Sequence, residues 1–152
     1  MNKLTLLFLC TGNSCRSQMA EGWARTLKAE KIEAYSAGIE THGLNPHAVR
    51  VMAEAGVDIS GHTSKNVETL RDIPFDVVVT VCGHADETCP AWLGHKARVL
   101  HVGFDDPPKL ARDASTEEEA LSHYRRVRDE IKTFVEGLPD HLDLIPPHAP
   151  EN

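Results

Sequence analysis

The sequence lacks long apolar runs and lacks runs of basic residues. Its 16 Lys and Arg residues stand against 23 Asp and Glu residues, a net charge of -7. No basic stripe is present that could neutralise a nucleic-acid backbone, so we expect no nucleic-acid partner. The apolar run near the start is short and ends in a cysteine and a polar loop, with no small-residue cleavage site. We therefore expect no signal peptide, no membrane span and no membrane partner.

Cysteine is also scarce, with four residues in a chain of 152. In a small secreted domain four cysteines would indicate disulfide staples, but this chain is larger and we expect it in the reducing cytoplasm. Paired thiols in that compartment more often bind a metal or take part in catalysis. The four cysteines are therefore the first candidates for chemistry.

The chain length and its 41% hydrophobic content suit one core and are too small for two. We expect a single domain over residues 1–138 and a monomer. Residues 139–152 are rich in proline and polar groups and predict a loosely ordered tail.

The hydrophobic pattern predicts an α/β fold. Nearly continuous apolar runs indicate parallel strands covered on both faces, and weaker runs add two more; the four expected strands are 3–9, 32–38, 75–82 and 97–103. Helical periodicity lies between them, and a longer helix over 115–138 has Ser115 or Thr116 as its cap. The pattern predicts a doubly wound, mostly parallel four-stranded sheet flanked by helices, with ligands at the carboxyl ends of its strands.

The segment CTGNSCRS, residues 10–17, follows the first expected strand and precedes a helix. Backbone N–H groups of such a loop converge on one point, where they bind tetrahedral oxyanions. Gly12 allows a tight backbone, Arg16 offers a planar pair of donors, and Cys10 is placed to attack the central atom. The expected oxyanion-binding residues are Thr11, Gly12, Asn13, Ser14, Cys15 and Arg16.

The partial positive charge of these N–H groups and the charge of Arg16 should favour the Cys10 thiolate. We expect the pKa of Cys10 to fall from ~8.5 to ~6, with the Ser17 hydroxyl as a further hydrogen-bond donor to its sulfur. A cysteine, five residues, an arginine and a hydroxyl residue form the pattern of thiol-based phosphatases. A nucleotide-binding loop fits less well, because its lysine is absent.

Departure of an oxygen from the attacked atom needs a proton donor. Asp105 and Asp106 follow the last expected strand, at a third carboxyl end, and two prolines stiffen that loop. We favour Asp105 as the general acid and keep Asp106 as the alternative.

The second thiol pair, Cys82 and Cys89, has three interpretations. Zinc is one, because His84 lies between the cysteines and His95 is near, but the spacing is too wide for a zinc knuckle and no second pair follows. Structural thiols are another. We favour redox exchange, in which Cys82 attacks Cys10 or its adduct and Cys89 then attacks Cys82. We expect no metal and no cofactor.

An oxyanion bound by one thiol and reduced by two more must have a reducible central atom, which arsenate has and phosphate lacks. Four segments, FLCTGNSCRSQMAEGWA, YSAGIETHGLNP, VVVTVCGHADETCP and GFDDP, together resemble the thioredoxin-coupled arsenate reductases. That family shares the fold of the low-molecular-weight protein tyrosine phosphatases. The resemblance covers the chain to about residue 137.

The resemblance implies that Cys10 attacks arsenate and that Cys82 attacks the arseno-cysteine and releases arsenite. A Cys10–Cys82 disulfide then becomes a Cys82–Cys89 disulfide, which thioredoxin reduces. It also implies that Asp105 is the general acid and that Ser17 supports the Cys10 thiolate. Cys15 takes part in no step of this mechanism, and we expect it to be structural or an oxidation liability.

One position departs from the family. Some members bind potassium through an asparagine, a glutamate and an aspartate; Asn13 and Glu21 match, but Lys65 stands where we expect the aspartate. We hypothesise that the lysine ammonium replaces the cation. His42 and His62 are expected to be surface or hydrogen-bonded residues and not metal ligands.

Two rival functions remain open. A phosphatase acting on phosphotyrosine or a small phosphate ester would use Cys10, Arg16 and Asp105 and leave the second thiol pair idle. A non-enzymatic redox or metal sensor would change conformation when Cys82 and Cys89 oxidise or bind metal. Such a sensor would not need the complete oxyanion loop.

Overall fold

The chain folds around one parallel sheet, in a computed structural model that describes residues 3–145. Its strands are β1 (Leu4–Cys10), β2 (Ile32–Gly38), β3 (Val77–Thr80) and β4 (Arg98–His101), in the spatial order β2-β1-β3-β4. Every neighbouring pair is parallel. The predicted four-stranded sheet is confirmed, and it is parallel throughout.

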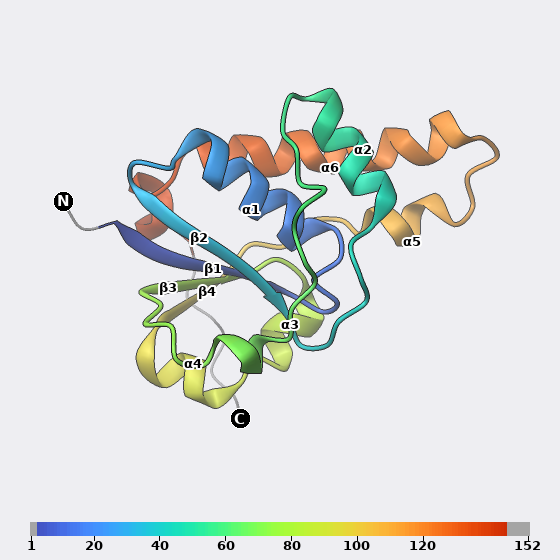
Figure 1. Ribbon diagram of the computed structural model, residues 1–152. Helices are drawn as coiled ribbons and strands as arrows, with labels where there is room; N and C mark the ends of the chain where they lie inside the picture. The colour runs from blue at the N-terminus through green and yellow to red at the C-terminus, as the bar shows by residue number, and fades with distance from the viewer. Residues whose placement is uncertain (1–2, 146–152) are drawn as a thin grey trace.

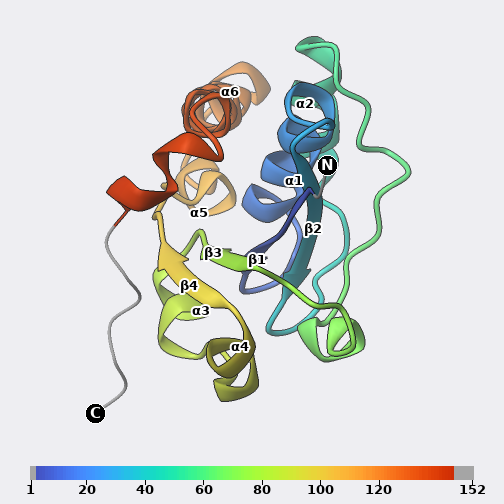
Figure 2. The ribbon, with the colours of Figure 1, turned by 90° about the vertical axis from the view of Figure 1, so that its left-hand side faces the viewer.

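Helices cover both faces of the sheet (Figures 1 and 2). One face carries α1 (Arg16–Leu27), α2 (Pro46–Glu54), α5 (Pro107–Ala111) and α6 (Glu117–Glu136), and the other carries α3 (Gly83–Glu87) and α4 (Ala91–Lys96). Two 3-10 helices, η1 (Val67–Leu70) and η2 (Asp140–Leu144), complete the described elements. No helix within residues 3–145 is both long and apolar enough to cross a membrane.

Burial explains the continuous apolar runs. The side chains of Leu6, Leu7, Phe8 and Leu9 in β1 are fully buried, as are those of Val78 and Val79 in β3. A parallel strand with helices on both faces has no polar side, so the alternation of a half-exposed strand is absent. These two strands form the centre of the sheet.

Helix α6 begins and ends as its sequence predicts. The Thr116 hydroxyl accepts a hydrogen bond from the Glu119 backbone N–H at 3.1 Å, and Gly137 lies at the C-terminal cap. Three glutamates fill the first turn, where the helix dipole favours negative charge. The Trp23 indole N–H donates to the Arg128 carbonyl, which fastens α1 to α6.

The expected tail, 139–152, is described only as far as residue 145. In that part, η2 buries Leu142, and Arg98 donates hydrogen bonds to the Leu142 carbonyl and to Asp143. The rest of the tail lies outside the described residues. The short helices α3, α4 and α5 were not expected from the sequence, because five or six residues are too few to show a helical period.

The strand order fixes the place of the site. From β1 the chain crosses through α1 to β2 on one side, and β3 lies on the other side, so the direction of winding changes between β1 and β3. A crevice forms at the carboxyl ends of strands at such a point. Leu9 pairs with Thr80 across β1 and β3, so Cys10 and Cys82 both follow this pair at the same sheet edge.

Candidate active site

The loop after β1 leaves its backbone donors free. Within residues 3–145, no group accepts a hydrogen bond from the backbone N–H groups of residues 12–17. The Thr11 N–H bonds to the Cys10 sulfur. Six consecutive free donors at a helix N-terminus form an anion-binding site, and this arrangement supports the predicted oxyanion loop.

Asn13 holds the loop in shape from the inside. Its backbone is left-handed, with φ 48°, and its side chain is fully buried. The amide Nδ2 donates to the hydroxyls of Ser17 and Ser36 at 2.9 and 3.0 Å. Its Oδ1 accepts from the Lys65 backbone N–H at 2.8 Å and from the Gln18 amide at 3.1 Å. The Asn13 side chain therefore supports the loop and does not face an anion.

Gly12 is required by close packing. A Cβ at this position would collide with the ring of His42. The His42 backbone N–H also donates to the Gly12 carbonyl at 2.9 Å. His42 itself is paired with Glu40 through its ring, at 2.6 Å, as expected for a hydrogen-bonded surface histidine.

Cys10 and Cys82 lie side by side as free thiols and are hydrogen-bonded to each other. Both are buried, with 5% and 6% of their surface exposed. The Thr11 hydroxyl lies 3.3 Å from the Cys82 sulfur, and the Ala85 backbone N–H donates to that sulfur at 3.4 Å. The structure thus brings together two cysteines separated by 72 positions in the sequence.

The two thiols shift each other's pKa in opposite directions. The hydrogen bond to Cys82 and burial raise the pKa of the Cys10 thiol above its usual range, although Arg16 opposes them. The hydrogen bonds from Cys10, Thr11 and the Ala85 N–H lower the pKa of Cys82 to about 5. This direction for Cys10 is opposite to the expected lowering, because the hydrogen bond to Cys82 and burial outweigh the charge of Arg16.

Arg16 bridges the first loop and the loop after β4. Its Nη1 donates to the Phe104 carbonyl at 2.9 Å, and its Nη2 lies 3.6 Å from Asp106 Oδ2. The guanidinium is only 12% exposed. Asp105, favoured in the sequence, instead points to Arg126 on α6, with Oδ2 at 3.0 Å from Nη2 and 65% of its side chain exposed. Of the two aspartates, the structure brings only Asp106 to Arg16.

Ser17 and Cys15 are both buried beside the loop. The Ser17 hydroxyl oxygen accepts the hydrogen bond from Asn13, which leaves its own proton available to donate. Burial raises the pKa of Cys15 above its usual range, so Cys15 is a protonated thiol at neutral pH. This state agrees with a structural role for Cys15.

Cys89 is less accessible than its polar neighbours suggested. It is 7% exposed, and its sulfur lies 3.9 Å from the Pro90 carbonyl. Helix α3 stands between Cys82 and Cys89. Its residue His84, considered in the sequence only as a zinc ligand, places ring Nδ1 at 3.0 Å from the Thr11 hydroxyl. This contact joins residues 73 positions apart and has no signal in the sequence.

No group of three or more His, Cys, Asp or Glu residues within 3–145 is arranged to hold a metal ion. The Nζ atom of Lys65 lies 4.0 Å from Glu21 Oε1 and donates to the Thr63 carbonyl at 2.8 Å. Burial lowers the pKa of Lys65, with Glu21 acting against that shift. Glu21 is buried and also pairs with Arg25, at 2.9 Å.

His62 borders the same buried carboxylate. Its Nε2 lies 3.7 Å from Glu21 Oε2, and its Nδ1 is hydrogen-bonded to the Gln18 amide oxygen at 3.1 Å. Burial lowers its pKa, so the neutral imidazole is favoured near neutral pH. The expectation of a hydrogen-bonded histidine is confirmed.

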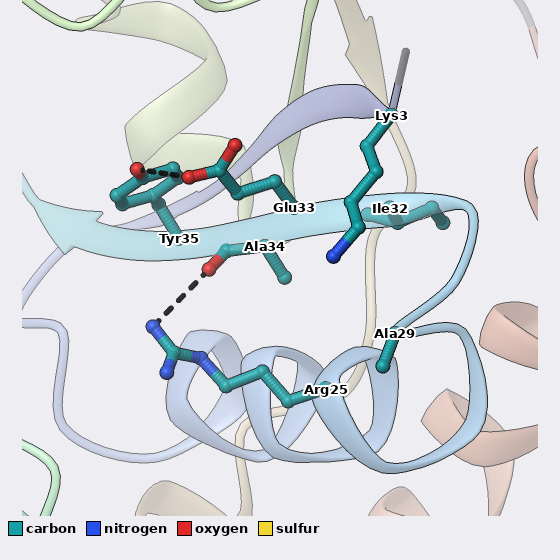
Figure 3. Close-up of a pocket in the computed structure, with 7 residues that line it drawn as sticks. All are labelled: Lys3, Arg25, Ala29, Ile32, Glu33, Ala34 and Tyr35. Carbon is teal, nitrogen blue, oxygen red and sulfur yellow. Dashed lines mark hydrogen bonds between the residues drawn. The ribbon is translucent and has the colours of Figure 1, made fainter. Parts of the chain in front are cut away.

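A separate hollow of about 240 Å³ lies between α1 and the amino-terminal half of β2 (Figure 3). Arg25 Nη2 donates across it to the Ala34 carbonyl at 3.3 Å, and the Tyr35 hydroxyl donates to Glu33 at 2.8 Å. It lies toward the opposite ends of the strands from Cys10. It contributes no residue to the candidate site.

Comparison with known proteins agrees with this geometry. The sequence is 53% identical over 140 residues to an arsenate reductase of Halalkalibacterium halodurans, covering 90% of this chain and 98% of that protein. It is 52% identical to an arsenate reductase of Bacillus subtilis, with the same coverage. A solved structure described as an arsenate reductase in the phosphate binding state superposes with a TM-score of 0.74 at 37% identity, over 89% of this chain and 95% of that chain.

The family-level match spans almost the whole described chain. The family model described as low molecular weight phosphotyrosine protein phosphatase matches residues 5–144, which include the oxyanion loop, both thiol segments and Asp106. The chain therefore belongs to the low molecular weight phosphotyrosine protein phosphatase family.

Proposed function

We propose that this protein reduces arsenate to arsenite through its three thiols Cys10, Cys82 and Cys89. The observation that carries the proposal is the hydrogen-bonded pair of Cys10 and Cys82 beside an oxyanion loop with free N–H donors. A hydrolytic phosphatase needs one thiol at this place. The names of the relatives, at about half identity over nine-tenths of the chain, support the same substrate.

In the first step the loop and Arg16 hold arsenate, and Cys10 attacks arsenic. The Cys10 proton passes along the hydrogen bond to the Cys82 sulfur, which leaves Cys10 as the thiolate. A sulfur–arsenic bond forms while an arsenic–oxygen bond breaks. Asp106, beside Arg16, is the group placed to give the departing oxygen a proton, so that it leaves as water. We assign the general acid to Asp106 and not to Asp105.

In the second step the Cys82 thiolate attacks the Cys10 sulfur. A Cys10–Cys82 disulfide forms, the sulfur–arsenic bond breaks, and its electron pair stays on arsenic. Arsenic is thereby reduced from the pentavalent to the trivalent state and leaves as arsenite, and the two sulfurs are oxidised. Cys10 is a good leaving group in the next exchange because Arg16 and the Thr11 N–H stabilise its thiolate.

In the third step Cys89 attacks Cys82 and frees Cys10. A helical spacing of seven residues separates Cα atoms by about 10 Å, beyond the roughly 7 Å that a disulfide can span. Helix α3 must therefore unwind, and the resulting Cys82–Cys89 disulfide comes within reach of an external dithiol. We propose thioredoxin as that partner, acting on a monomer in the cytoplasm.

The test is arsenate-dependent NADPH consumption by the purified chain with thioredoxin and thioredoxin reductase. We expect sustained consumption by the wild type, none above the arsenate-free control by Cys82→Ser, and one arsenite per chain from Cys89→Ser. Cys15→Ala is the matched control and should turn over. Repeated turnover by both Cys82→Ser and Cys89→Ser would refute the relay.

A phosphatase is the second candidate, favoured by the same loop, Arg16 and Asp106. The loop binds phosphate and arsenate alike, since the two ions share shape and charge. Hydrolysis of p-nitrophenyl phosphate is therefore expected as a side activity that survives in Cys82→Ser. Hydrolysis without any arsenate turnover by the wild type would make the chain a phosphatase.

A further inference from the structure

A line of three polar groups leads from the buried Cys82 sulfur to the surface. The Thr11 hydroxyl lies 3.3 Å from the Cys82 sulfur and 3.0 Å from Nδ1 of His84. Cys82 is buried, Thr11 is half-buried and His84 is exposed. The line therefore connects a thiol that has little access to water with an imidazole that is exposed to it.

The proposed function, on which this inference rests, creates a need for such a path. When Cys10 attacks arsenate, its proton moves to Cys82, yet Cys82 must be a thiolate for the second step. Cys10 cannot take the proton back, because its sulfur is then bonded to arsenic. The hydrogen bond from Cys10, the largest cause of the low pKa of Cys82, is lost at the same moment.

Of the other contacts of Cys82, only one can accept a proton. Within the described residues these are Arg16, whose charge acts on the sulfur, the Ala85 backbone N–H and the Thr11 hydroxyl. A guanidinium and an amide N–H only donate, whereas a hydroxyl both donates and accepts. Thr11 is thus the one contact able to pass the proton on, and His84 is the basic group on its far side.

We propose that His84 receives the proton of Cys82 through the Thr11 hydroxyl before Cys82 attacks the arseno-cysteine. The S–H bond of Cys82 breaks and its electron pair stays on sulfur. The proton goes to Thr11 Oγ1, and the Thr11 hydroxyl proton goes to Nδ1 of His84, which then exchanges it with water. No oxidant or reductant takes part. His84 is a positioning residue that acts on Cys82 through Thr11, and it serves the second step and not the first.

The two steps can be measured separately. Arsenite release in a single turnover depends on Cys82, whereas p-nitrophenyl phosphate hydrolysis depends on Cys10, Arg16 and Asp106. We expect the ratio of the first rate to the second to fall about 100-fold in His84→Ala, the lower end of the range for loss of a proton acceptor. The matched control is His95→Ala, an exposed histidine on α4, which should keep the wild-type ratio.

Two further measurements separate proton acceptance from structure. Added imidazole should raise the ratio in His84→Ala, because it takes the place of the missing side chain. His84→Asn retains a hydrogen-bonding amide but accepts no proton, so its ratio should stay low. A wild-type ratio in His84→Ala, its restoration by His84→Asn, or no response to imidazole would overturn the proposal. No arsenite release from the wild type would remove the proposed function as well.

Discussion

Arg16 faces Asp106, with 3.6 Å between its Nη2 atom and Oδ2 of the carboxylate. The same guanidinium donates to the Phe104 carbonyl, two residues before Asp106, so it fixes the loop that carries this carboxylate. An anion held by Arg16 would therefore lie next to Asp106. The neighbouring Asp105 is held at Arg126, on α6.

This relationship predicts different effects for the two aspartates. Asp106→Asn should lower kcat for p-nitrophenyl phosphate about 100-fold or more, because the leaving oxygen loses its proton donor. Asp105→Asn removes only an exposed ion pair with Arg126, so it should change kcat by less than about threefold. Steady-state kinetics on the two variants checks this. The opposite order of effects would return the general acid to Asp105.

The hydrogen bond between the two thiols predicts reciprocal pKa changes. Cys10→Ala should raise the pKa of Cys82 from about 5, since the hydrogen bond from Cys10 is the largest cause that lowers it. Cys82→Ala should lower the pKa of Cys10, because its largest raising cause is removed and Arg16 still favours the thiolate. Thiolate absorbance near 240 nm against pH, with Cys15 and Cys89 replaced by alanine, gives both values.

The lowered pKa of Cys82 also makes the stability of the fold depend on pH. A folded pKa of about 5 lies below the unfolded value of a cysteine, so the Cys82 thiolate stabilises the fold fully above the unfolded pKa. That contribution is lost as the pH falls toward 5. Chemical unfolding of the wild type and of a Cys10→Ala/Cys82→Ala double variant, which removes both coupled thiols, should therefore show a smaller difference at pH 5 than at pH 8. An equal difference at both pH values would contradict the lowered pKa of Cys82.

The position of the Lys65 ammonium beside Glu21 predicts that turnover does not depend on potassium. Its ammonium lies 4.0 Å from the buried Glu21 carboxylate, and we hypothesise that it supplies the positive charge that a bound cation would bring. Arsenate turnover should be equal in KCl and NaCl at the same ionic strength. Lys65→Asp removes this charge and should become faster in KCl than in NaCl. Activation of the wild type by potassium would refute the hypothesis.

The buried hydrogen bonds of Asn13 predict that its replacement lowers the stability of the fold. Asn13→Ala removes four hydrogen bonds from a buried network and puts alanine, which tolerates the left-handed region less well than asparagine, at a position with positive φ. We expect the free energy of unfolding to fall by about 2–4 kcal/mol. Asn13→Gly keeps the backbone conformation accessible and loses only the hydrogen bonds. It should therefore be less destabilised than Asn13→Ala; equal losses would mean that backbone strain contributes nothing.

The central strands and the first loop could be predicted because their signals are local. Strands covered on both faces need continuous apolar runs, and β1 and β3 have them. The loop from Cys10 to Ser17 has its glycine, arginine and hydroxyl residue within eight consecutive positions. Parallel strands present their carboxyl ends at one edge of the sheet, and this rule predicted that Cys82 lies near Cys10. Each inference needed only spacing along the chain or a general rule of topology.

The sequence by itself determined the parallel sheet, the oxyanion loop and the meeting of the two thiol segments. Only the tertiary structure decided which aspartate faces Arg16, that Cys10 and Cys82 shift each other's pKa in opposite directions, and that His84 reaches Thr11. Asp105 and Asp106 are adjacent in a loop, which lacks the regular side-chain period of a helix or a strand. Their spacing therefore cannot tell which one points inward. The pKa of Cys10 depends on burial and on a sulfur 72 positions away. Such properties arise from packing between distant segments, and local sequence does not carry them.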